Sequence, residues 1–256
     1  MLVQQGRFCF GLLILGFASH ATAAGGSVPA AIEVQAPAGN SQFKHANFKG
    51  MTASQQARHV ADWVVDSGDH QSMSFVIVDK TEAQVFVFNA DGVLRGAAAA
   101  LVGLAVGDDA VPGIGTRKLS SIRPDERTTP AGRFVASLDR NLHGGEILWV
   151  DYDTAISLHP VVTNNASERR AERLATPSPL DNRISYGCIN VPADFFQRVV
   201  HPAFKGAYGV VYVLPETRSA QSVFASYDVS ERESSQLAGQ HLATQVATHM
   251  PSSEAK

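Results

Sequence analysis

One stretch of the chain, RISYGCINVP at residues 183–192, contains a residue suited to covalent chemistry. Cys188 has a glycine directly before it, and Ile189 and Asn190 follow it. Further upstream, His159 supplies an imidazole that can take the proton of a thiol. A cysteine activated by a histidine attacks acyl carbonyl groups as a thiolate, so these two residues predict an acyl-transfer site.

Each residue around Cys188 has an expected role in such a reaction. A free thiol has a pKa of ~8.5 and needs a nearby imidazole to form a thiolate at neutral pH. We expect His159 to protonate the leaving amine and then to deprotonate the acceptor. The backbone N–H groups of Tyr186, Gly187 and Cys188 are the expected donors to the oxyanion of the tetrahedral intermediate. Gly187 suits this role because it has no side chain to block a substrate.

The N-terminus has the three parts of a secretory signal peptide. Arg7 precedes an apolar run over residues 8–18, and Ala21, Thr22 and Ala23 provide the small-residue cleavage step. The run is much shorter than the ~20 residues that cross a bilayer. We therefore expect a signal peptide over residues 1–23, rather than an ordinary buried helix. The mature protein is expected in the periplasm or cell envelope, without a transmembrane segment.

If the protein is exported, its cysteines would be expected to form disulfides. The sequence has 2 cysteines, and cleavage after Ala23 removes Cys9 and leaves Cys188 without a partner. Exported proteins usually pair their cysteines, so a single thiol indicates either an intermolecular bridge or a reactive site. An inert, buried cysteine is the plainest alternative.

The composition excludes several other classes of protein. A hydrophobic fraction of 45% and a charged fraction of 18% are typical of a globular chain. The net charge of −3 gives no electrostatic basis for binding nucleic acid. Neither a clustered metal-ligand spacing nor a nucleotide-binding glycine pattern occurs in the sequence. We expect a monomer with no metal and no cofactor.

Short apolar segments separated by turn residues predict a mostly β fold, a sandwich or barrel with short helices. Helices are expected over residues 52–66, with Thr52 as the N-cap, and over residues 193–200. The predicted strands lie at residues 74–79, 84–89, 97–106, 146–152, 155–159 and 209–214, and residues 128–136 are expected to form a turn that leads into a further short strand.

This pattern also predicts how the chain is divided. After the signal peptide, residues 24–71 form a lead-in and the N-terminal helix, and residues 72–215 form the catalytic domain. Residues 216–256 are rich in polar residues, which indicates a flexible, disordered tail.

The motifs around Cys188 and His159 resemble the L,D-transpeptidase catalytic domain of bacterial cell-wall enzymes. That family has an upstream catalytic histidine and a Ser/Thr-His-Gly-Cys-hydrophobic-Asn/Arg motif, which residues 185–190 match except at Tyr186. Residues 129–134 are similar to its Thr-Pro-x-Gly-x-Phe segment, residues 76–80 to its opening strand, and residues 91–92 to its first turn. The resemblance covers residues 72–214.

The resemblance implies a reaction as well as a fold. In it, Cys188 takes the acyl group of a peptidoglycan stem peptide, expels the terminal D-amino acid and passes the acyl group to an amine, with His159 as acid and base. Transfer to water by the same residues gives a carboxypeptidase or amidase. Arg183, Ser185 and Asn190 are candidate substrate-binding residues. The alternatives are a solvated loop arginine for Arg183 and turn-stabilising hydrogen bonds for the other two.

Three features depart from the family pattern. Tyr186 replaces a histidine, Pro160 follows His159, and the loop over residues 163–182 is longer than usual. With Pro160 in place, a serine hydroxyl cannot orient the imidazole, although a backbone carbonyl group still can. Tyr186 favours a second class of function, an exported wall-binding module that has lost catalysis. The mixed charges of residues 168–173 indicate an exposed helical turn or, alternatively, a lid.

Overall fold

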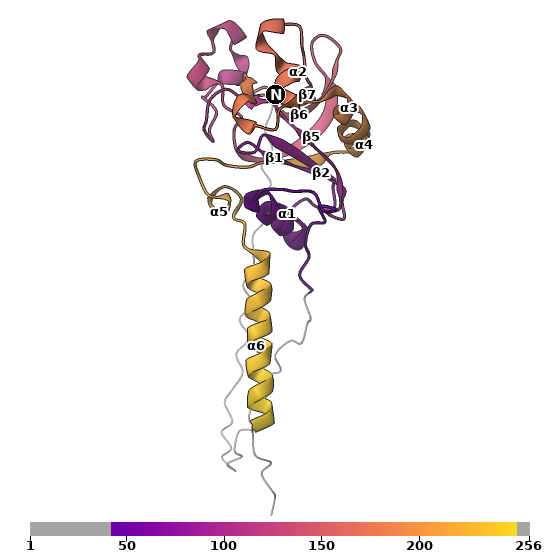
Figure 1. Ribbon diagram of the computed structural model, residues 1–256, viewed down its shortest axis with the longest axis vertical. Helices are drawn as coiled ribbons and strands as arrows, with labels where there is room; N and C mark the ends of the chain where they lie inside the picture. Colours follow the sequence, from indigo (N-terminus) through magenta and orange to yellow (C-terminus); the bar gives the residue numbers. More distant parts are fainter. Residues whose placement is uncertain (1–41, 250–256) are drawn as a thin grey trace, which may run out of the picture. The chain divides into compact units, whose positions relative to one another are not determined.

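Segments rich in β-branched and aromatic residues form the main sheet of the computed structural model, which describes residues 42–249. The sheet has 8 strands in the order β3-β2-β1-β10-β5-β6-β7-β9, and β4 pairs with β8 in a 2-stranded sheet. The mostly β fold with short helices is confirmed (Figure 1). The strands are β1 (Phe75–Asp79), β2 (Gln84–Phe88), β3 (Leu94–Ala99), β4 (Val102–Gly103), β5 (Gly132–Arg140), β6 (Glu146–Asp151), β7 (Ile156–Pro160), β8 (Arg183–Ser185), β9 (Ile189–Val191) and β10 (Gly209–Val213).

The two edges of the main sheet meet near Leu101. Beyond β3 the chain leaves β2, and Leu101 exchanges two backbone hydrogen bonds with Asn190 of β9. β4 then runs parallel to β8. The prediction of one strand over residues 97–106 is therefore wrong, because the chain changes its pairing partner between β3 and β4. This change of partner nearly closes the sheet.

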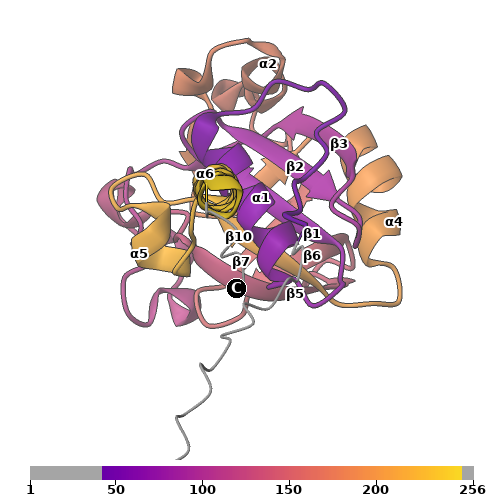
Figure 2. The same cartoon turned by 90° about the horizontal axis from the view of Figure 1, so that it is seen from below.

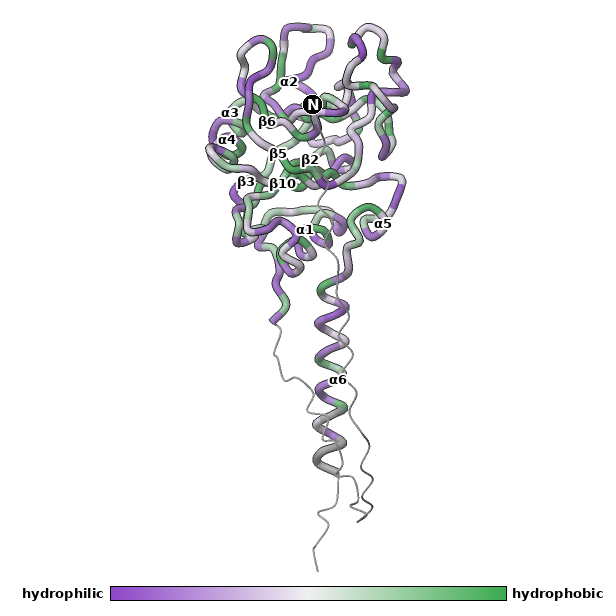
Figure 3. Tube along the Cα trace, turned by 180° about the vertical axis from the view of Figure 1, so that it is seen from behind, coloured by the Kyte–Doolittle hydropathy of each residue, from purple (hydrophilic) through white to green (hydrophobic). Residues whose placement is uncertain are grey.

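Alternate residues of β1 enter two hydrophobic cores, as the two-residue period of a strand requires. Val76 and Val78 pack with the helical segment over residues 193–204. Phe75 and Ile77 point to the other face, where they pack with the N-terminal helix. The central strands are accordingly mostly green, the colour of hydrophobic residues, in Figure 3. Both faces of the central strand are therefore buried, and β7 and β9 belong to the sheet that this packing stabilises.

The predicted N-terminal helix is α1 (Gln55–Ser67), and it begins later than expected. Its N-cap is Ser54, not Thr52, because the Ser54 hydroxyl accepts a hydrogen bond from the Ala57 N–H over 3.0 Å. α1 is in contact with α6 (Val229–His249), which Figure 2 shows viewed along its axis. Within residues 42–249, no helix has the length and apolar character needed to cross a bilayer.

The second predicted helix is longer than expected. It consists of α3 (Ala193–Phe195), a π-helical turn η6 (Phe196–Val200) and α4 (His201–Phe204). Pro202 explains the widened turn, because it has no N–H to donate and its ring crowds the carbonyl group one turn earlier. The segment ends at Lys205, and its buried face supplies Phe196, Val200 and Phe204 to the core.

Two long connections contain short helical turns rather than open loop. The first connection contains η1 (Ile114–Thr116), η2 (Leu119–Ser121) and η3 (Pro124–Glu126). The second, over residues 163–182, contains η4 (Ala166–Glu168), α2 (Arg170–Ala175) and η5 (Pro179–Asp181). The helical turn predicted near residues 168–173 is therefore present, but the Arg170 side chain is only 13% exposed.

The predicted tail begins later than the composition indicates. Residues 216–229 pack against the domain through α5 (Ala220–Phe224), and Ala220, Phe224 and Val229 are buried. The apolar residues are few, but they lie on one side of the segment, so composition alone understates their burial. α6 continues the chain from this point. The predicted signal peptide, the lead-in up to residue 41 and residues 250–256 lie outside the described residues.

Buried charges join this C-terminal segment to the domain. Lys80 Nζ donates to the Gly107 carbonyl oxygen over 2.6 Å and to Asp108 Oδ1 over 2.9 Å, and it lies 3.5 Å from Glu216 Oε1. Arg183 forms an ion pair with the same glutamate. We name Lys80, Asp108, Arg183 and Glu216 the Lys80 cluster.

Candidate active site

Parallel pairing of β7 with β9 brings the predicted base close to the predicted nucleophile. His159 on β7 is the register partner of Asn190 on β9, and Cys188 directly precedes β9. Ser157 lies two residues before His159 and therefore points to the same side of β7. Residues 186–188 connect β8 to β9, so the conformation of this short loop decides where the thiol lies.

Glycine is required at position 187 by the packing of the loop. Its φ of +127° is rarely adopted by side-chain residues, and a Cβ would lie 2.7 Å from the Thr128 carbonyl oxygen and 2.6 Å from Ile156 Cδ1. Thr129 Oγ1 donates a hydrogen bond to the Gly187 carbonyl oxygen over 2.7 Å. This constraint differs from the open approach for a substrate that the sequence suggested.

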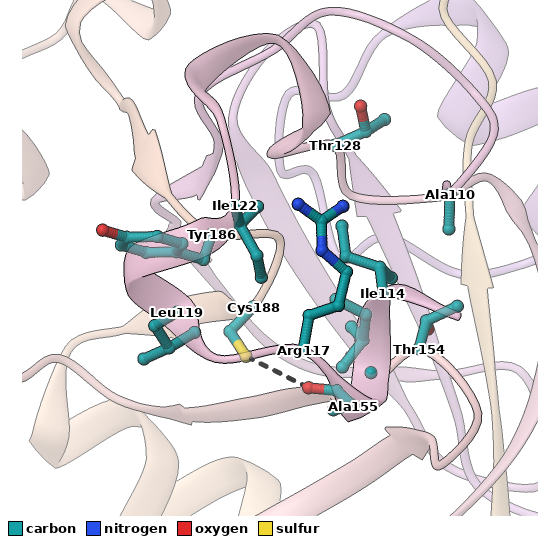
Figure 4. A pocket seen from close by; sticks show the side chains of 12 residues that line it. Ala110, Ile114, Arg117, Leu119, Ile122, Thr128, Thr154, Ala155, Tyr186 and Cys188 are labelled. Carbon is teal, nitrogen blue, oxygen red and sulfur yellow. Dashed lines mark hydrogen bonds between the residues drawn. The ribbon is translucent and has the colours of Figure 1, made fainter. Parts of the chain in front are cut away.

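The thiol of Cys188 is free and half-buried. Its Sγ donates to the Ala155 carbonyl oxygen over 3.7 Å (Figure 4). The sulfur also lies 3.7 Å from Ser157 Oγ. Burial raises the pKa of this thiol, but hydrogen bonding to His159 and the charge of the imidazole outweigh burial and lower the pKa below its usual value. A weakly held thiol with a lowered pKa is suited to thiolate formation.

The imidazole of His159 is held from one side by the chain itself. Nδ1 lies 2.8 Å from the Pro160 carbonyl oxygen and donates to it, which leaves Nε2 to accept a proton. Burial lowers the pKa of His159, but hydrogen bonding to Cys188, the thiolate charge and the Pro160 carbonyl group raise it above its usual value. The orienting carbonyl group expected beside Pro160 is thus that of Pro160 itself.

A cavity of about 80 Å³ opens beside Cys188. Figure 4 shows Tyr186, Leu119 and Ile122 on one side of the thiol and Ala155 below it. The loop over residues 163–182, the alternative lid, contributes none of the residues that line this cavity. The lining residues are Ala110, Ile114, Gly115, Arg117, Leu119, Ile122, Thr128, Thr154, Ala155, Ile156, Tyr186 and Cys188.

The three predicted oxyanion donors are not equivalent. The Gly187 N–H donates to Ser185 Oγ over 3.0 Å, so this group is occupied. The Ser185 hydroxyl in turn donates to the Cys188 carbonyl oxygen over 2.6 Å. Within residues 42–249, no acceptor is found for the N–H groups of Tyr186 and Cys188. The Tyr186 ring is fixed separately, with Arg127 Cζ 3.9 Å from its centroid.

The candidate substrate-binding residues have protein partners. Ser185 is 2% exposed and Asn190 is 1% exposed, and both hydrogen-bond within the loop that holds Cys188. Arg183 belongs to the Lys80 cluster and is not among the residues that line the cavity. The geometry therefore gives these three residues supporting contacts, and their contact with a substrate stays a prediction.

Sequence reasoning gave no role to three residues that contact the site. Ser157 touches the sulfur, Thr129 holds Gly187, and Arg170 Nη1 donates to Asn190 Oδ1 over 2.6 Å. The two-residue period of β7 was the signal for Ser157. Nothing local predicted Arg170, because its partner lies in another element. Among the described residues, no group of three or more His, Cys, Asp or Glu side chains could hold a metal.

Comparisons with known proteins give a limited likeness. No family model and no curated protein matches the chain. One similar solved structure is the helical cell shape determining protein Pgp2 from Campylobacter jejuni, with 17% identity over 57% of this chain and 49% of that chain, at a TM-score of 0.37. The match therefore spans about half of that relative's length.

Two further solved structures carry the name of the family suggested by the motifs. The catalytic domain of the Enterococcus faecium L,D-transpeptidase has 16% identity over 56% of this chain and 98% of that chain, at a TM-score of 0.34. L,D-transpeptidase 3 from Mycobacterium tuberculosis has 13% identity over 55% of this chain and 60% of that chain, at a TM-score of 0.35. At this level of similarity, the case for a function rests on the geometry of the site.

Proposed function

We propose that this protein is an exported cysteine acyltransferase that acts on peptidoglycan stem peptides by L,D-transpeptidation. The observation that carries the proposal is the Cys188–His159 pair beside a cavity, in which the pKa of the thiol is lowered and that of the imidazole is raised. The motif resemblance over residues 185–190 and 129–134 supports the choice of substrate. Export rests on the signal-peptide pattern of residues 1–23.

The first half-reaction forms a thioester. His159 Nε2 takes the thiol proton, and the Cys188 thiolate attacks the carbonyl carbon of the bond that joins the terminal D-amino acid to the stem. The N–H groups of Tyr186 and Cys188 are the donors available to the oxyanion. As the C–N bond breaks, the imidazolium of His159 gives its proton to the leaving amine, so that charge and protons balance.

The second half-reaction restores the enzyme. An acceptor amine attacks the thioester carbonyl carbon, His159 takes the proton of that amine, and the Cys188 sulfur leaves as a thiolate. The product contains a new amide bond, and the thiolate and imidazolium return to the resting pair by proton transfer. Water in place of the amine gives a carboxylic acid, which is the carboxypeptidase outcome from the same residues.

Intact-mass spectrometry after incubation with a carbapenem tests the nucleophile directly. We expect a mass increase equal to one carbapenem in the mature protein and none in Cys188→Ala, because a β-lactam carbonyl is attacked as an acyl donor. No adduct, together with slow alkylation of Cys188 by iodoacetamide near neutral pH, would contradict the proposal and favour a wall-binding module. Incubation with tetrapeptide stems and an amine then separates amide formation from hydrolysis.

A further inference from the structure

Arg170 connects the loop over residues 163–182 to the imidazole through a single amide group. Its Nη1 donates to Asn190 Oδ1 over 2.6 Å. The Nδ2 of the same Asn190 lies 3.4 Å from His159 Nε2 and 3.3 Å from the Cys188 carbonyl oxygen. The Arg170 side chain is only 13% exposed, and Glu168 pairs with its Nε. A mostly buried arginine is thus linked through Asn190 to His159 Nε2, the atom that takes the thiol proton.

The arginine, together with the Cys188 carbonyl oxygen on the other side, fixes which way the amide faces. Oxygen and nitrogen of an asparagine side chain are assigned from their hydrogen-bond partners. A guanidinium group is always a donor, because it does not lose its proton in proteins. The atom of Asn190 that faces Arg170 must therefore be the acceptor Oδ1. The donor Nδ2 is left to face His159 Nε2.

This orientation of Asn190 favours one form of the imidazole. A donor facing Nε2 is satisfied only when Nε2 has a lone pair, which matches the form in which Nδ1–H donates to the Pro160 carbonyl oxygen. The opposite orientation would set Oδ1 against Nε2 and stabilise an Nε2–H group. The charge of Arg170 acts in the same sense, since it lowers the pKa of His159 and opposes the effect of Cys188.

We propose that Arg170 is a positioning residue of the site, which acts through Asn190 to favour the neutral form of His159 that accepts a proton at Nε2. The inference rests on the proposed function and adds a control of the proton acceptor to it. In the second half-reaction, His159 must be neutral to take the proton of the acceptor amine. Arg170 therefore supports transfer, at the expense of thiolate formation in the resting enzyme.

Two charged groups act on His159 in opposite directions. The thiol of Cys188 faces it from the loop before β9 and favours the imidazolium, whereas Arg170 faces it from α2 and disfavours the imidazolium. Glu168 accepts a hydrogen bond from Arg170 Nε, whereas Asn190 accepts one from Nη1 of the same arginine. Loss of the arginine therefore removes a positive charge and the shorter of the two hydrogen bonds that fix the amide, and both effects stabilise the imidazolium.

The rate of Cys188 alkylation by iodoacetamide as a function of pH tests this inference. In Arg170→Leu, a more stable imidazolium should move the midpoint of the profile about 0.5–1 pH unit lower, with roughly three- to tenfold faster alkylation on the acid side. Arg170→Lys, which keeps a charge and a donor, should stay near the wild-type profile. A merely structural arginine would not make the thiol more reactive.

Matched variants separate the effect from damage to the loop. Arg173→Leu removes an arginine of the same helix that donates to the carbonyl oxygens of Glu168 and Asp181, and it should leave the profile unchanged. Arg170→Gln keeps a hydrogen-bond donor without the charge. It provides a second measurement of the same effect if the leucine variant does not fold. In a His159→Ala background, Arg170→Leu should have no effect on the profile.

The results distinguish this inference from the proposed function. A midpoint that stays in place or rises in both Arg170→Leu and Arg170→Gln overturns the role of Arg170, whether or not Cys188 forms a carbapenem adduct. A shift that persists in the His159→Ala background also overturns it, because the effect would not pass through the imidazole. A lowered midpoint in these variants supports the role of Arg170 whatever the carbapenem result, because the alkylation profile reports on the thiol and the imidazole and not on acyl transfer.

Discussion

Strand β8 links the Lys80 cluster, to which its Arg183 belongs, with the loop that holds Cys188. The ionisable side chains of these two regions differ in how tightly they are hydrogen-bonded. In the Lys80 cluster, the side chains of Lys80 and Asp108 are each 1% exposed, and the hydrogen bonds of Lys80 Nζ to Gly107 and Asp108 are 2.6 and 2.9 Å long. At the other region, the sulfur of Cys188 lies beside a cavity, 3.7 Å from the Ala155 carbonyl oxygen and 3.7 Å from Ser157 Oγ. Full pairing stabilises the fold, whereas the loosely held thiol is left able to react with a substrate.

The pKa shifts express the same difference. Burial raises the pKa of Asp108, but hydrogen bonds from Thr217, Lys80 and the N–H of Glu216 hold it far below its usual range. This carboxylate stays charged throughout the physiological range. The shifts of Cys188 and His159 run toward each other instead, because each charged form stabilises the other. The first pattern is that of a structural ion pair, and the second is that of a proton-transfer pair.

The largest expected effect comes from breaking the Lys80 cluster. Lys80→Met removes the buried cation of Asp108 and leaves Glu216 paired only with Arg183, so we expect a loss of about 3–5 kcal/mol in the free energy of unfolding. Urea unfolding at pH 7 measures it. Because the pKa of Asp108 is lower in the folded than in the unfolded protein, its contribution is complete above about pH 4 and is lost as the pH falls further. The free energy of unfolding of the wild-type protein should therefore fall below that pH.

An exposed ion pair provides the control for Lys80. Arg198 pairs with Asp194 four residues earlier on the same helical segment, and the two side chains are 79% and 83% exposed. Arg198→Met should cost only about 0.3–0.5 kcal/mol. Equal losses for the two variants would show that burial and pairing of the Lys80 cluster do not distinguish it from surface charges.

An intermediate effect is expected at Gly187. In Gly187→Ala, the new methyl group meets the Thr128 carbonyl oxygen and Ile156, so we expect a loss of about 2–4 kcal/mol and a thiol that alkylates more slowly. Gly144→Ala is the matched control, since Gly144 also has a positive φ, of +79°, but nothing within 4 Å of the added Cβ. If both alanines cost the same in unfolding, the constraint is the φ angle and not the packing of the Cys188 loop.

Most strands of the main sheet could be predicted from local signals, whereas the short strands β4, β8 and β9 could not, because they depend on pairing partners distant in the sequence. The alternation of Val76 and Val78 with Phe75 and Ile77 indicates a strand covered on two faces, whichever elements supply the cover. His159 and Cys188 stand in a recognisable motif, and the parallel pairing of β7 with β9 brings their strands together.

The two arginines show where sequence reasoning fails. Arg183 stands beside the motif and was a candidate for binding a substrate, yet its partner is Glu216, in a segment expected to be a polar tail. Arg170 stands in a run of mixed charges typical of an exposed turn, yet it contacts Asn190. In both cases the role depends on a partner distant in the sequence, and no local pattern specifies which charged residue finds a buried partner.

The smallest expected effect is at Ser157, where the hydroxyl contacts the sulfur over 3.7 Å. Hydrogen bonding from Ser157 lowers the pKa of Cys188, so Ser157→Ala should raise the alkylation midpoint by a few tenths of a pH unit and slow alkylation at pH 7 about twofold. Thr154→Val is the control, because Thr154 lines the same cavity but its hydroxyl donates to Asp151. A shift as large as that of His159→Ala would mean that the serine, rather than the imidazole, sets the reactivity of the thiol. A downward shift would mean that the hydroxyl acts as an acceptor and stabilises the neutral thiol.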